Sequence, residues 1–443
     1  MKWPSSAPER RILRTVGTAA APQPIGTRTD MHSYKRWVIF TASLFLAISA
    51  ALVNGAHLYY MSAVLLMLPV VSYLLGMTAM RGLEFSREVP ATGWAGETAT
   101  FHVVVRSRSP IPRLFLRAWD DLPEWLVPID PEPPLFNAAP NAVSRAPYQV
   151  HLAKRGAYRL ESMVVTALDP LGIFAFSRRF RAESEVLVFP VPQPISDIPL
   201  TGAERYGLRD TPVAAVRGSG VDPDGVREYV PGDPLRRMHW KSTARTGRLN
   251  VIEFDESRSV NVVLALDQHA GSCCGQGAET TFEHLVRAAA SLAQAAIRQG
   301  ASVRLATSLT EDASSFLGRG TDQLYAILGG LARVEPEDRE RMSATLIERV
   351  GPVAAGTSLI VLTSGLDLDL PGALARYAGE GSQVAVVYAD PHAFPGARSL
   401  PSRDAQRTFM QGLIAVKAIP FTLSRTESGE LQPEPVYDVS SWH

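Results

Sequence analysis

The chain has 443 residues, of which 46% are hydrophobic and 20% are charged, a composition typical of a globular chain with two or three domains. Its 44 Lys and Arg balance its 44 Asp and Glu, which excludes a chain-wide positive field that would attract nucleic acid. The two cysteines, Cys273 and Cys274, are adjacent, which excludes a disulfide framework and fits a reducing compartment.

Two uncharged apolar segments lie near the N-terminus, at 37–53 and 58–80. The second is long enough to cross a bilayer core, the first is near the lower limit, and the linker allows only an antiparallel hairpin. We therefore expect a transmembrane hairpin over residues 36–82. It follows a disordered basic tail over residues 1–35, rich in Arg, Pro and Ala.

The charges beside the two apolar segments predict their orientation. Arginine and lysine precede the first segment, Arg81 and Arg87 follow the second, and the linker contains only His57. The positive-inside rule then places both flanks in the cytoplasm. We expect a multi-pass protein whose soluble domains face the cytoplasm, with the lipid bilayer as its first partner.

Residues 84–200 have the pattern of a β-sandwich domain. In the segment 100–106, apolar Phe101, Val103 and Val105 alternate with the residues between them, as in a half-buried strand. The tetrapeptide at 169–172, Asp-Pro-Leu-Gly, has type I turn residues. No helical period intervenes, so two packed sheets are the natural architecture.

Residues 257–435 alternate strands with helices. The run 260–267 is continuously apolar, as expected of a strand covered on both faces, and 281–300 has the period of a helix. This alternation predicts a doubly wound α/β domain, so the fold class is multidomain α+β: hairpin, β-sandwich, then α/β domain.

Residues 201–256 form a junction between the two domains. The segment 230–233 predicts a type II turn, after which Asp233 is a suitable helix N-cap. We expect a short helix over 235–245, ended by Gly247 as a left-handed C-cap.

The junction carries the side chains that we predict as a binding site. They are Arg227, Glu228, Tyr229, Asp233, Arg236, His239, Trp240, Lys241, Arg245 and Arg248. Three explanations stay open: a structural hub in which arginines bridge carboxylates, an anion or partner site, and catalysis. Arginines buried against carboxylates would favour the hub, and a concave unpaired cluster would favour the anion site. No catalytic residue is assigned, because neighbouring positions on one short helix do not converge as a nucleophile and a base.

The block DGVREYVPGDPLRRMHWKSTARTGRLNVIEFDE, at 224–256, closely resembles the signature of the bacterial domain-of-unknown-function-58 family. KRGAYRLESMVV, DPLGIFAFSRR and VLVFP upstream are also similar to that family, so the resemblance covers about residues 80–440. The resemblance implies a von Willebrand factor type A-like domain at 257–435. It also implies a MoxR-type AAA+ ATPase as a partner, and a transglutaminase-like membrane protein as a possible second one.

A type A domain often binds Mg²⁺ through Asp-x-Ser-x-Ser and a later Thr and Asp, all hard oxygen ligands. This chain reads Asp-Gln-His-Ala-Gly at 267–271 and Thr-Ser-Gly at 363–365. We therefore expect a degenerate metal site without Mg²⁺ at Asp267, His269, Thr363 and Ser364. A Zn²⁺ site that adds Cys273 would lack standard spacing.

Two hypotheses of function follow. The first is a non-enzymatic, membrane-anchored scaffold or adaptor in the bacterial inner membrane, working with a MoxR-type ATPase through its type A-like domain. The alternative is an anion- or phosphate-binding or enzymatic protein that uses the arginine-rich junction. No cofactor is expected, and nucleic acid is not an expected partner, because Tyr229 and Trp240 are the only aromatic side chains that interleave with the basic residues of 227–249.

Overall fold

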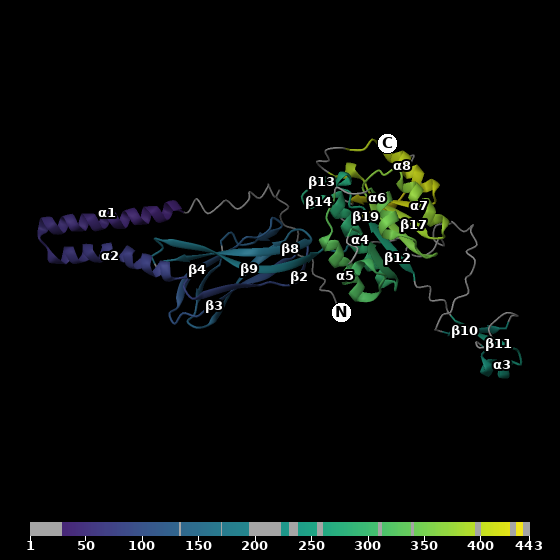
Figure 1. The fold of residues 1–443 in the computed structure, drawn as a ribbon, viewed down its shortest axis with the longest axis horizontal. Helices are drawn as coiled ribbons and strands as arrows, with labels where there is room; N and C mark the ends of the chain where they lie inside the picture. The colour runs from purple at the N-terminus through teal and green to yellow at the C-terminus, as the bar shows by residue number, and fades with distance from the viewer. Residues whose placement is uncertain are drawn as a thin grey trace. The chain divides into compact units, whose positions relative to one another are not determined.

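The computed structural model describes residues 29–132, 134–169, 171–194, 223–229, 238–254, 260–308, 312–337, 341–394, 400–425 and 431–436. The chain divides into two compact units, residues 1–186 and 187–443 (Figure 1). Each unit has its own hydrophobic core, so each is described by itself.

The first unit begins with helices α1 (Thr29–Val53) and α2 (Ala56–Thr78). They are joined through Asn54, whose φ of 50° is left-handed, and they contact each other through Ser43 and Ser62. Within the described part of the chain, α2 is the one helix long and apolar enough to cross a membrane, and the apolar part of α1, Trp37–Val53, is shorter. Helix α1 begins at Thr29, inside the range 1–35 predicted for the tail.

Two sheets follow, with strand orders β1-β3-β7-β5 and β2-β9-β8-β4-β6. Pairs such as β3–β7 and β4–β8 are antiparallel. Their strands are β1 (Leu83–Glu88), β2 (Thr92–Trp94), β3 (Thr98–Ser107), β4 (Arg113–Asp120), β5 (Leu126–Pro128), β6 (Leu135–Ala138), β7 (Val143–Leu152), β8 (Gly156–Leu168) and β9 (Ala175–Phe189).

One hydrophobic core joins the two sheets. It contains Phe85 and Val105 from the first sheet and Leu116 and Met163 from the second. The predicted turn at 169–172 is confirmed, because the amide of Gly172 donates to the carbonyl of Asp169 at 2.9 Å.

A buried ion pair also joins the two sheets. Arg87 on β1 donates to both carboxylate oxygens of Asp120 on β4, and their side chains are 0% and 2% exposed. Arg87 also donates to the carbonyls of Leu160 and Ala182, and Tyr148 donates to Asp120. Burial, followed by the charge of Asp120, raises the pKa of Tyr148 far above its ordinary value, so its hydroxyl keeps its proton.

The second unit contains a six-stranded sheet of order β15-β12-β16-β17-β18-β19, in which β19 alone is antiparallel to its neighbour. Its strands are β12 (Asn261–Leu266), β15 (Ser302–Ala306), β16 (Ser358–Thr363), β17 (Gln383–Ala389), β18 (Ile419–Arg425) and β19 (Leu431–Pro435). Small two-stranded sheets pair β10 (Pro223–Glu228) with β11 (Asn250–Phe254) and β13 (Gly275–Gln276) with β14 (Glu279–Thr280).

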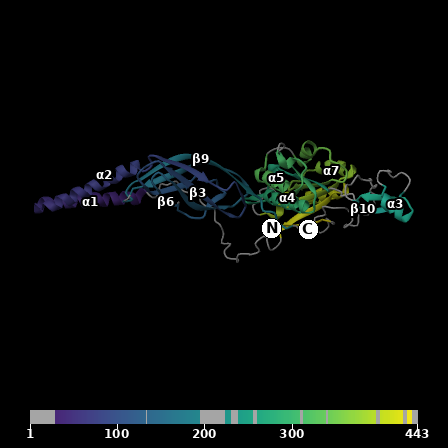
Figure 2. The same cartoon turned by 90° about the horizontal axis from the view of Figure 1, so that it is seen from below.

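Helices cover both faces of the six-stranded sheet. Helices α4 (Thr281–Arg298) and α5 (Gly320–Arg333) lie side by side (Figure 2), and both contact β15. On the other face, buried side chains of α7 (Leu370–Gly379) and α8 (Arg403–Ala415) form one hydrophobic cluster with Val263 and Ala265 of β12. The remaining helical segments are α3 (Trp240–Thr246), η3 (Ala270–Ser272), η4 (Ala313–Ser315), α6 (Met342–Thr345), η5 (Leu346–Val350) and η6 (Pro391–Ala393).

Burial on both faces explains why β12 and β16 read as continuous apolar runs. The doubly wound arrangement also brings the carboxyl ends of its parallel strands to one edge of the sheet.

Candidate functional site

The first candidate site lies where the carboxyl ends of β12 and β16 meet. In the order β15-β12-β16, the chain leaves β12 for one neighbour and later returns to the other side. Such a topological switch point is where open α/β sheets bind their ligands. Asp267 directly follows β12, and Thr363 ends β16.

Asp267 and Thr363 are buried, and they bind each other. The hydroxyl of Thr363 donates to Asp267 Oδ2 at 2.6 Å, and the amide of His269 donates to Oδ1 at 3.0 Å. Burial is the main cause that raises the pKa of the Asp267 carboxyl, and the two hydrogen bonds oppose it. The carboxylate that would be the first metal ligand is therefore occupied by donors from its own chain.

The space beside this pair is closed by Ser272, Ser364 and Gly365. Ser364 Oγ donates to the carbonyl of Ser272 at 2.6 Å, and the amide of Gly365 donates to Thr363 Oγ1 at 3.0 Å. A Cβ on Gly365 would collide with Ser272 Oγ and lie 3.4 Å from Asp267 Oδ2. A glycine at this position thus permits the two loops to approach closely.

The structure separates the four residues of the predicted degenerate metal site. Asp267 and Thr363 come together, whereas His269 contributes its backbone amide and Ser364 turns to Ser272. Among the described residues, no three His, Cys, Asp or Glu side chains are grouped as metal ligands would be. The donor set therefore suits loop closure better than an octahedral oxygen shell for Mg²⁺.

The two cysteines lie on the loop after η3, next to this site, and both are free thiols. Burial raises the pKa of the Cys274 thiol, and the neighbouring Cys273 adds to this. A raised pKa lowers the thiolate fraction, so Cys274 lacks the activation of a catalytic nucleophile.

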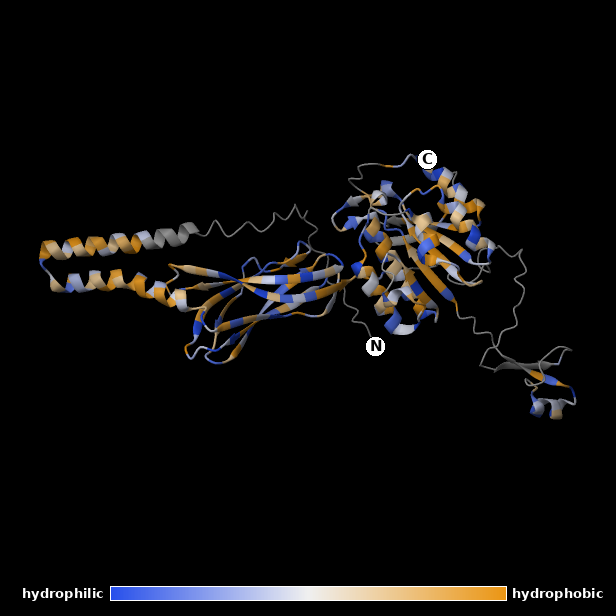
Figure 3. Cartoon of the chain, viewed as in Figure 1, coloured by the Kyte–Doolittle hydropathy of each residue, from blue (hydrophilic) through white to orange (hydrophobic). Residues whose placement is uncertain are grey.

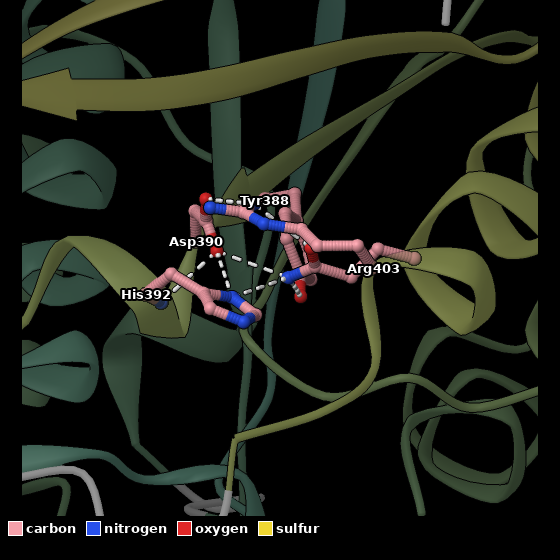
Figure 4. A network of polar contacts seen from close by, with 5 residues as sticks. Tyr388, Asp390, His392 and Arg403 are labelled. Carbon is pink, nitrogen blue, oxygen red and sulfur yellow. Dashed lines mark hydrogen bonds and ion pairs between the residues drawn. The ribbon is translucent and has the colours of Figure 1, made fainter. Parts of the chain in front are cut away.

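A second polar cluster lies at the carboxyl end of β17 (Figure 4). Asp390 Oδ2 accepts from Arg403 at 2.8 Å, and its Oδ1 accepts from the amide of His392 and from Gln406. Gln406 also donates to the hydroxyl of Tyr388 at 3.1 Å. Burial alone would raise the pKa of Asp390, but these hydrogen bonds, led by that of Arg403, lower it below its ordinary value.

Sequence reasoning missed this second cluster. Its available signal was the position of Asp390 directly after an apolar strand, the same signal that singled out Asp267. Nothing in the sequence marked Arg403, which contacts Asp390 from 13 positions further along the chain. The cluster joins the start of α8 to the end of β17, so its hydrogen bonds order this edge of the sheet.

The junction forms a small module of β10, β11 and α3. The amide of Tyr229 donates to the carbonyl of Leu249 at 2.8 Å, and the amide of His239 donates to the carbonyl of Asn250 at 2.8 Å. Arg227 and Glu228 lie on β10, whereas Asp233 and Arg236 lie outside the described residues.

The helix of this module begins later than predicted. Met238 bridges Val251, and His239 is the N-cap, its Nδ1 accepting from the amide of Ser242 at 3.2 Å. This bridge to β11 keeps Met238 out of the helix, so α3 starts at Trp240. The predicted C-cap is confirmed, since Gly247 has a φ of 70°.

The described side chains of the module are mostly exposed. Trp240 is 66% exposed, and Lys241, Arg245 and Arg248 are exposed as well. Lys241 and Arg245 are four residues apart on α3, so they share a helix face. Among the described residues, neither of these two cations has an ion pair. The module can therefore present an aromatic ring and positive charge to a binding partner.

These features define a protein with an apolar N-terminal helix, two β sheets, and an α/β domain whose switch point is closed by its own side chains. Residues 225–404 match the family model described as protein of unknown function DUF58. The uncharacterized protein YeaD of Bacillus subtilis (strain 168) is 25% identical over 312 residues, covering 68% of this chain and 76% of that protein. Both matches support a place for this chain in the DUF58 family.

Solved structures give much weaker likenesses. Alpha-2-macroglobulin of Escherichia coli is 14% identical with a TM-score of 0.20, and the match covers 24% of this chain and 16% of that chain. The CARDB domain of PF1109 from Pyrococcus furiosus is 12% identical with a TM-score of 0.16, over 24% of this chain and 94% of that chain. Likenesses at these TM-scores carry no argument.

Proposed function

We propose that this protein is a membrane-anchored scaffold or adaptor that holds a partner protein at the cytoplasmic face of the bacterial inner membrane. One observation carries the proposal. Helices α1 and α2 are coloured mostly as hydrophobic in Figure 3. Large apolar side chains are exposed along both, including Leu52 at 81% and Tyr60 at 74%. This surface is far more apolar than that of a helix exposed to water, so we infer that lipid surrounds the two helices.

The dimensions of the helices support anchoring. Helix α2 has 23 residues, which at 1.5 Å per residue span ~34 Å, against ~30 Å for a hydrocarbon core. Ser43 and Ser62 hydrogen-bond each other's carbonyls between α1 and α2. Small polar residues are the usual contacts between membrane helices, so we infer that α1 crosses the bilayer with α2 as a hairpin.

The cytoplasmic orientation is inferred from charge. Arg81 follows α2 and is exposed, and basic residues precede the apolar part of α1. Arg87, which also follows α2 in sequence, is buried against Asp120 in the folded unit. Free Cys273 and Cys274 are compatible with a reducing compartment.

We infer that the first unit is a β-sandwich and the second a von Willebrand factor type A-like domain that binds protein without a metal bridge. The parallel sheet with helices on both faces supports the second assignment. The Asp267–Thr363 hydrogen bond supports a closed metal position, since it uses the carboxylate that would coordinate the ion. The partner's contacts then come from the domain surface.

The junction module is the surface that we assign to the partner. Exposed tryptophan and arginine are the side chains that most often dominate binding energies at protein interfaces, and the short helix α3 carries exposed Trp240, Lys241 and Arg245. By resemblance, the partner is a MoxR-type AAA+ ATPase, with a transglutaminase-like membrane protein as a second component.

Co-purification tests this proposal. The full chain, extracted from membranes with ATP present, should enrich a MoxR-type ATPase. The variant Lys241→Glu with Arg245→Glu should reduce that enrichment roughly tenfold, as the loss of ~1.4 kcal/mol of binding energy would. The control Arg298→Glu with Lys417→Glu makes the same charge change at exposed positions of the same unit and should leave enrichment unchanged. If no such ATPase elutes together with the full chain after purification from membranes, the scaffold proposal is refuted.

The shared face of Lys241 and Arg245 also favours a second candidate function, the binding of a phosphate-bearing ligand. Salt dependence distinguishes this function from protein docking through Trp240. Binding of a phosphorylated ligand should weaken steeply between 50 and 200 mM salt, at roughly the slopes seen for other phosphate contacts. Binding insensitive to salt would exclude this function.

A further inference from the structure

The end of the β unit next to α2 exposes large apolar side chains. Ile111 is 61% exposed, Leu114 45%, Leu171 42% and Phe115 36%. We call these four residues the apolar rim. Three come from the segment between β3 and the start of β4, and Leu171 comes from the turn between β8 and β9.

Strand pairing brings these separate segments to one end of the unit. Leu83, the first residue of β1 after α2, pairs with Ser107, and the amide of Arg108 donates to the carbonyl of Gly82 at 2.8 Å. The segment that contains Ile111 therefore starts beside the exit of α2. Leu116 on β4 pairs with Ala167 at the end of β8, so Leu114 and Phe115 lie next to the 169–174 turn.

The turn is fixed against α2. Asp169 is buried, and its Oδ1 accepts from the amides of Ile173 and Phe174 at 2.7 Å each, while its Oδ2 accepts from the hydroxyl of Ser72 on α2. Tyr73 of α2 stacks edge-on against Phe174, with 5.3 Å between ring centroids. A carboxylate that accepts from both elements holds the turn on the helix.

Two further features show that this contact is built into the fold. A Cβ on Gly76 would collide with the ring of Phe176, so glycine is needed for the close approach of α2 to β9. Phe115 has a φ of 58°, which is costly for an aromatic residue, and its amide donates to Asn137 Oδ1 at 2.9 Å. The strained bulge at the start of β4 leaves Phe115 exposed.

The rim is continuous with the apolar surface of α2. Leu171 lines one groove of about 540 Å³ together with Val64, Met67, Val71 and Leu75 of that helix. Ser72, which holds the turn, lies ~9 Å before the end of α2 at 1.5 Å per residue, within the ~5–10 Å that interfacial apolar groups reach below the headgroups. The side chains next to Leu171 are thus those that a bilayer would cover.

We propose that the apolar rim inserts into the headgroup–acyl boundary of the membrane that α2 crosses, so that the β unit stands directly on the lipid surface. The inference rests on the proposed membrane anchoring. Exposed Arg81, directly after α2, lies at the level where a cation meets lipid phosphates. The two-point contact, through α2 and through the rim, restricts the tilt of the β unit.

Site-directed fluorescence in bilayers tests this proposal. In the full chain with Cys273→Ser and Cys274→Ser, single cysteines replace Leu171, Ile111, Val64 or Glu97, each labelled with an environment-sensitive dye. The protein is reconstituted in vesicles of three parts phosphatidylcholine to one part phosphatidylglycerol. Val64 reports on anchoring through α2, and exposed Glu97, next to the opposite end of β3, is the matched control.

Lipid doxyl-labelled near the headgroup should quench the dyes at Leu171 and Ile111 by roughly half or more, because interfacial side chains lie ~5–10 Å into the boundary. Aqueous iodide should quench the dye at Glu97 instead. If Val64 is quenched by lipid but Leu171 and Ile111 are quenched only by iodide, the rim proposal fails while the anchoring stands. If neither quencher reaches Leu171, protein covers the rim and the proposal also fails. If Val64 is not quenched by lipid, the anchoring itself is refuted.

Discussion

Replacing Thr363 by valine should open the closed switch point of the α/β domain. Valine keeps the shape of threonine but removes the hydroxyl that donates to Asp267 Oδ2 at 2.6 Å and accepts from the amide of Gly365 at 3.0 Å. A hydrogen bond to a charged group contributes ~1.5–3 kcal/mol, and an orphaned buried amide adds to the loss. We expect Thr363→Val to lower the free energy of unfolding by about 2–4 kcal/mol.

Thr363→Ser is the matched control, because serine keeps both hydrogen bonds and loses one methyl group, worth ~1 kcal/mol. Hydrogen exchange at the slowest amides of β12 and β16 in the full chain measures both variants. A loss of 2–4 kcal/mol should accelerate exchange by about 30- to 900-fold at constant pH.

The pH dependence of this loss follows from the pKa of Asp267. Burial raises that pKa in the folded protein, so the folded state takes up a proton before the unfolded chain does as the pH falls. The valine variant lacks a donor to the charged form, which raises the folded pKa further. The loss in free energy of unfolding caused by Thr363→Val should therefore be largest at pH values above the folded pKa of Asp267. It should shrink as the pH falls through that pKa.

Two results would refute this reasoning. Asp267→Asn and Thr363→Val should be coupled in a double-mutant cycle by about 1 kcal/mol or more, and strict additivity would mean that their hydrogen bond contributes nothing. Slower exchange of the wild-type β12 and β16 amides on addition of Mg²⁺ would mean that the carboxylate is available to a metal ion.

Three other predictions concern single residues. Gly365→Ala should destabilise the α/β domain by about 1–3 kcal/mol, measured by the same exchange, because its Cβ meets the facing loop. Asp120→Asn should destabilise the β unit by about 3–5 kcal/mol, seen in denaturant unfolding followed by tryptophan fluorescence, because Arg87 keeps an uncompensated buried charge; an unchanged midpoint would contradict the ion pair. The pKa of Asp390 is lower in the folded protein than its ordinary value of 3.8, so the ionised carboxylate stabilises the fold at pH values above 3.8. This stabilisation is lost as the pH falls through the folded pKa. Asp390→Asn should therefore flatten the stability profile in that acidic window, whereas an unchanged profile would show that Arg403 does not stabilise the carboxylate.

Local sequence patterns predicted most of the secondary structure. The alternating side chains of β3 and the continuous apolar run of β12 depend on which faces of a strand are buried, and this pattern can be read from neighbouring residues. The turn at Asp169 and the C-cap at Gly247 were also predicted, because both depend on the backbone preferences of one or two residues. The start of α3 was not, since the pairing of Met238 with Val251 overrides local helix signals.

The apolar composition of α2 and the loss of the serines after Asp267 could both be read from the chain alone. The hydrogen bonds that hold the site together join residues that are distant in the sequence. Asp267 meets Thr363 across 96 positions, and Ser72 meets Asp169 across 97. Each pair forms because sheet topology brings two strand ends, or a turn and a helix, to one place. No local pattern encodes that meeting, so the closed switch point and the apolar rim became visible only in the tertiary structure.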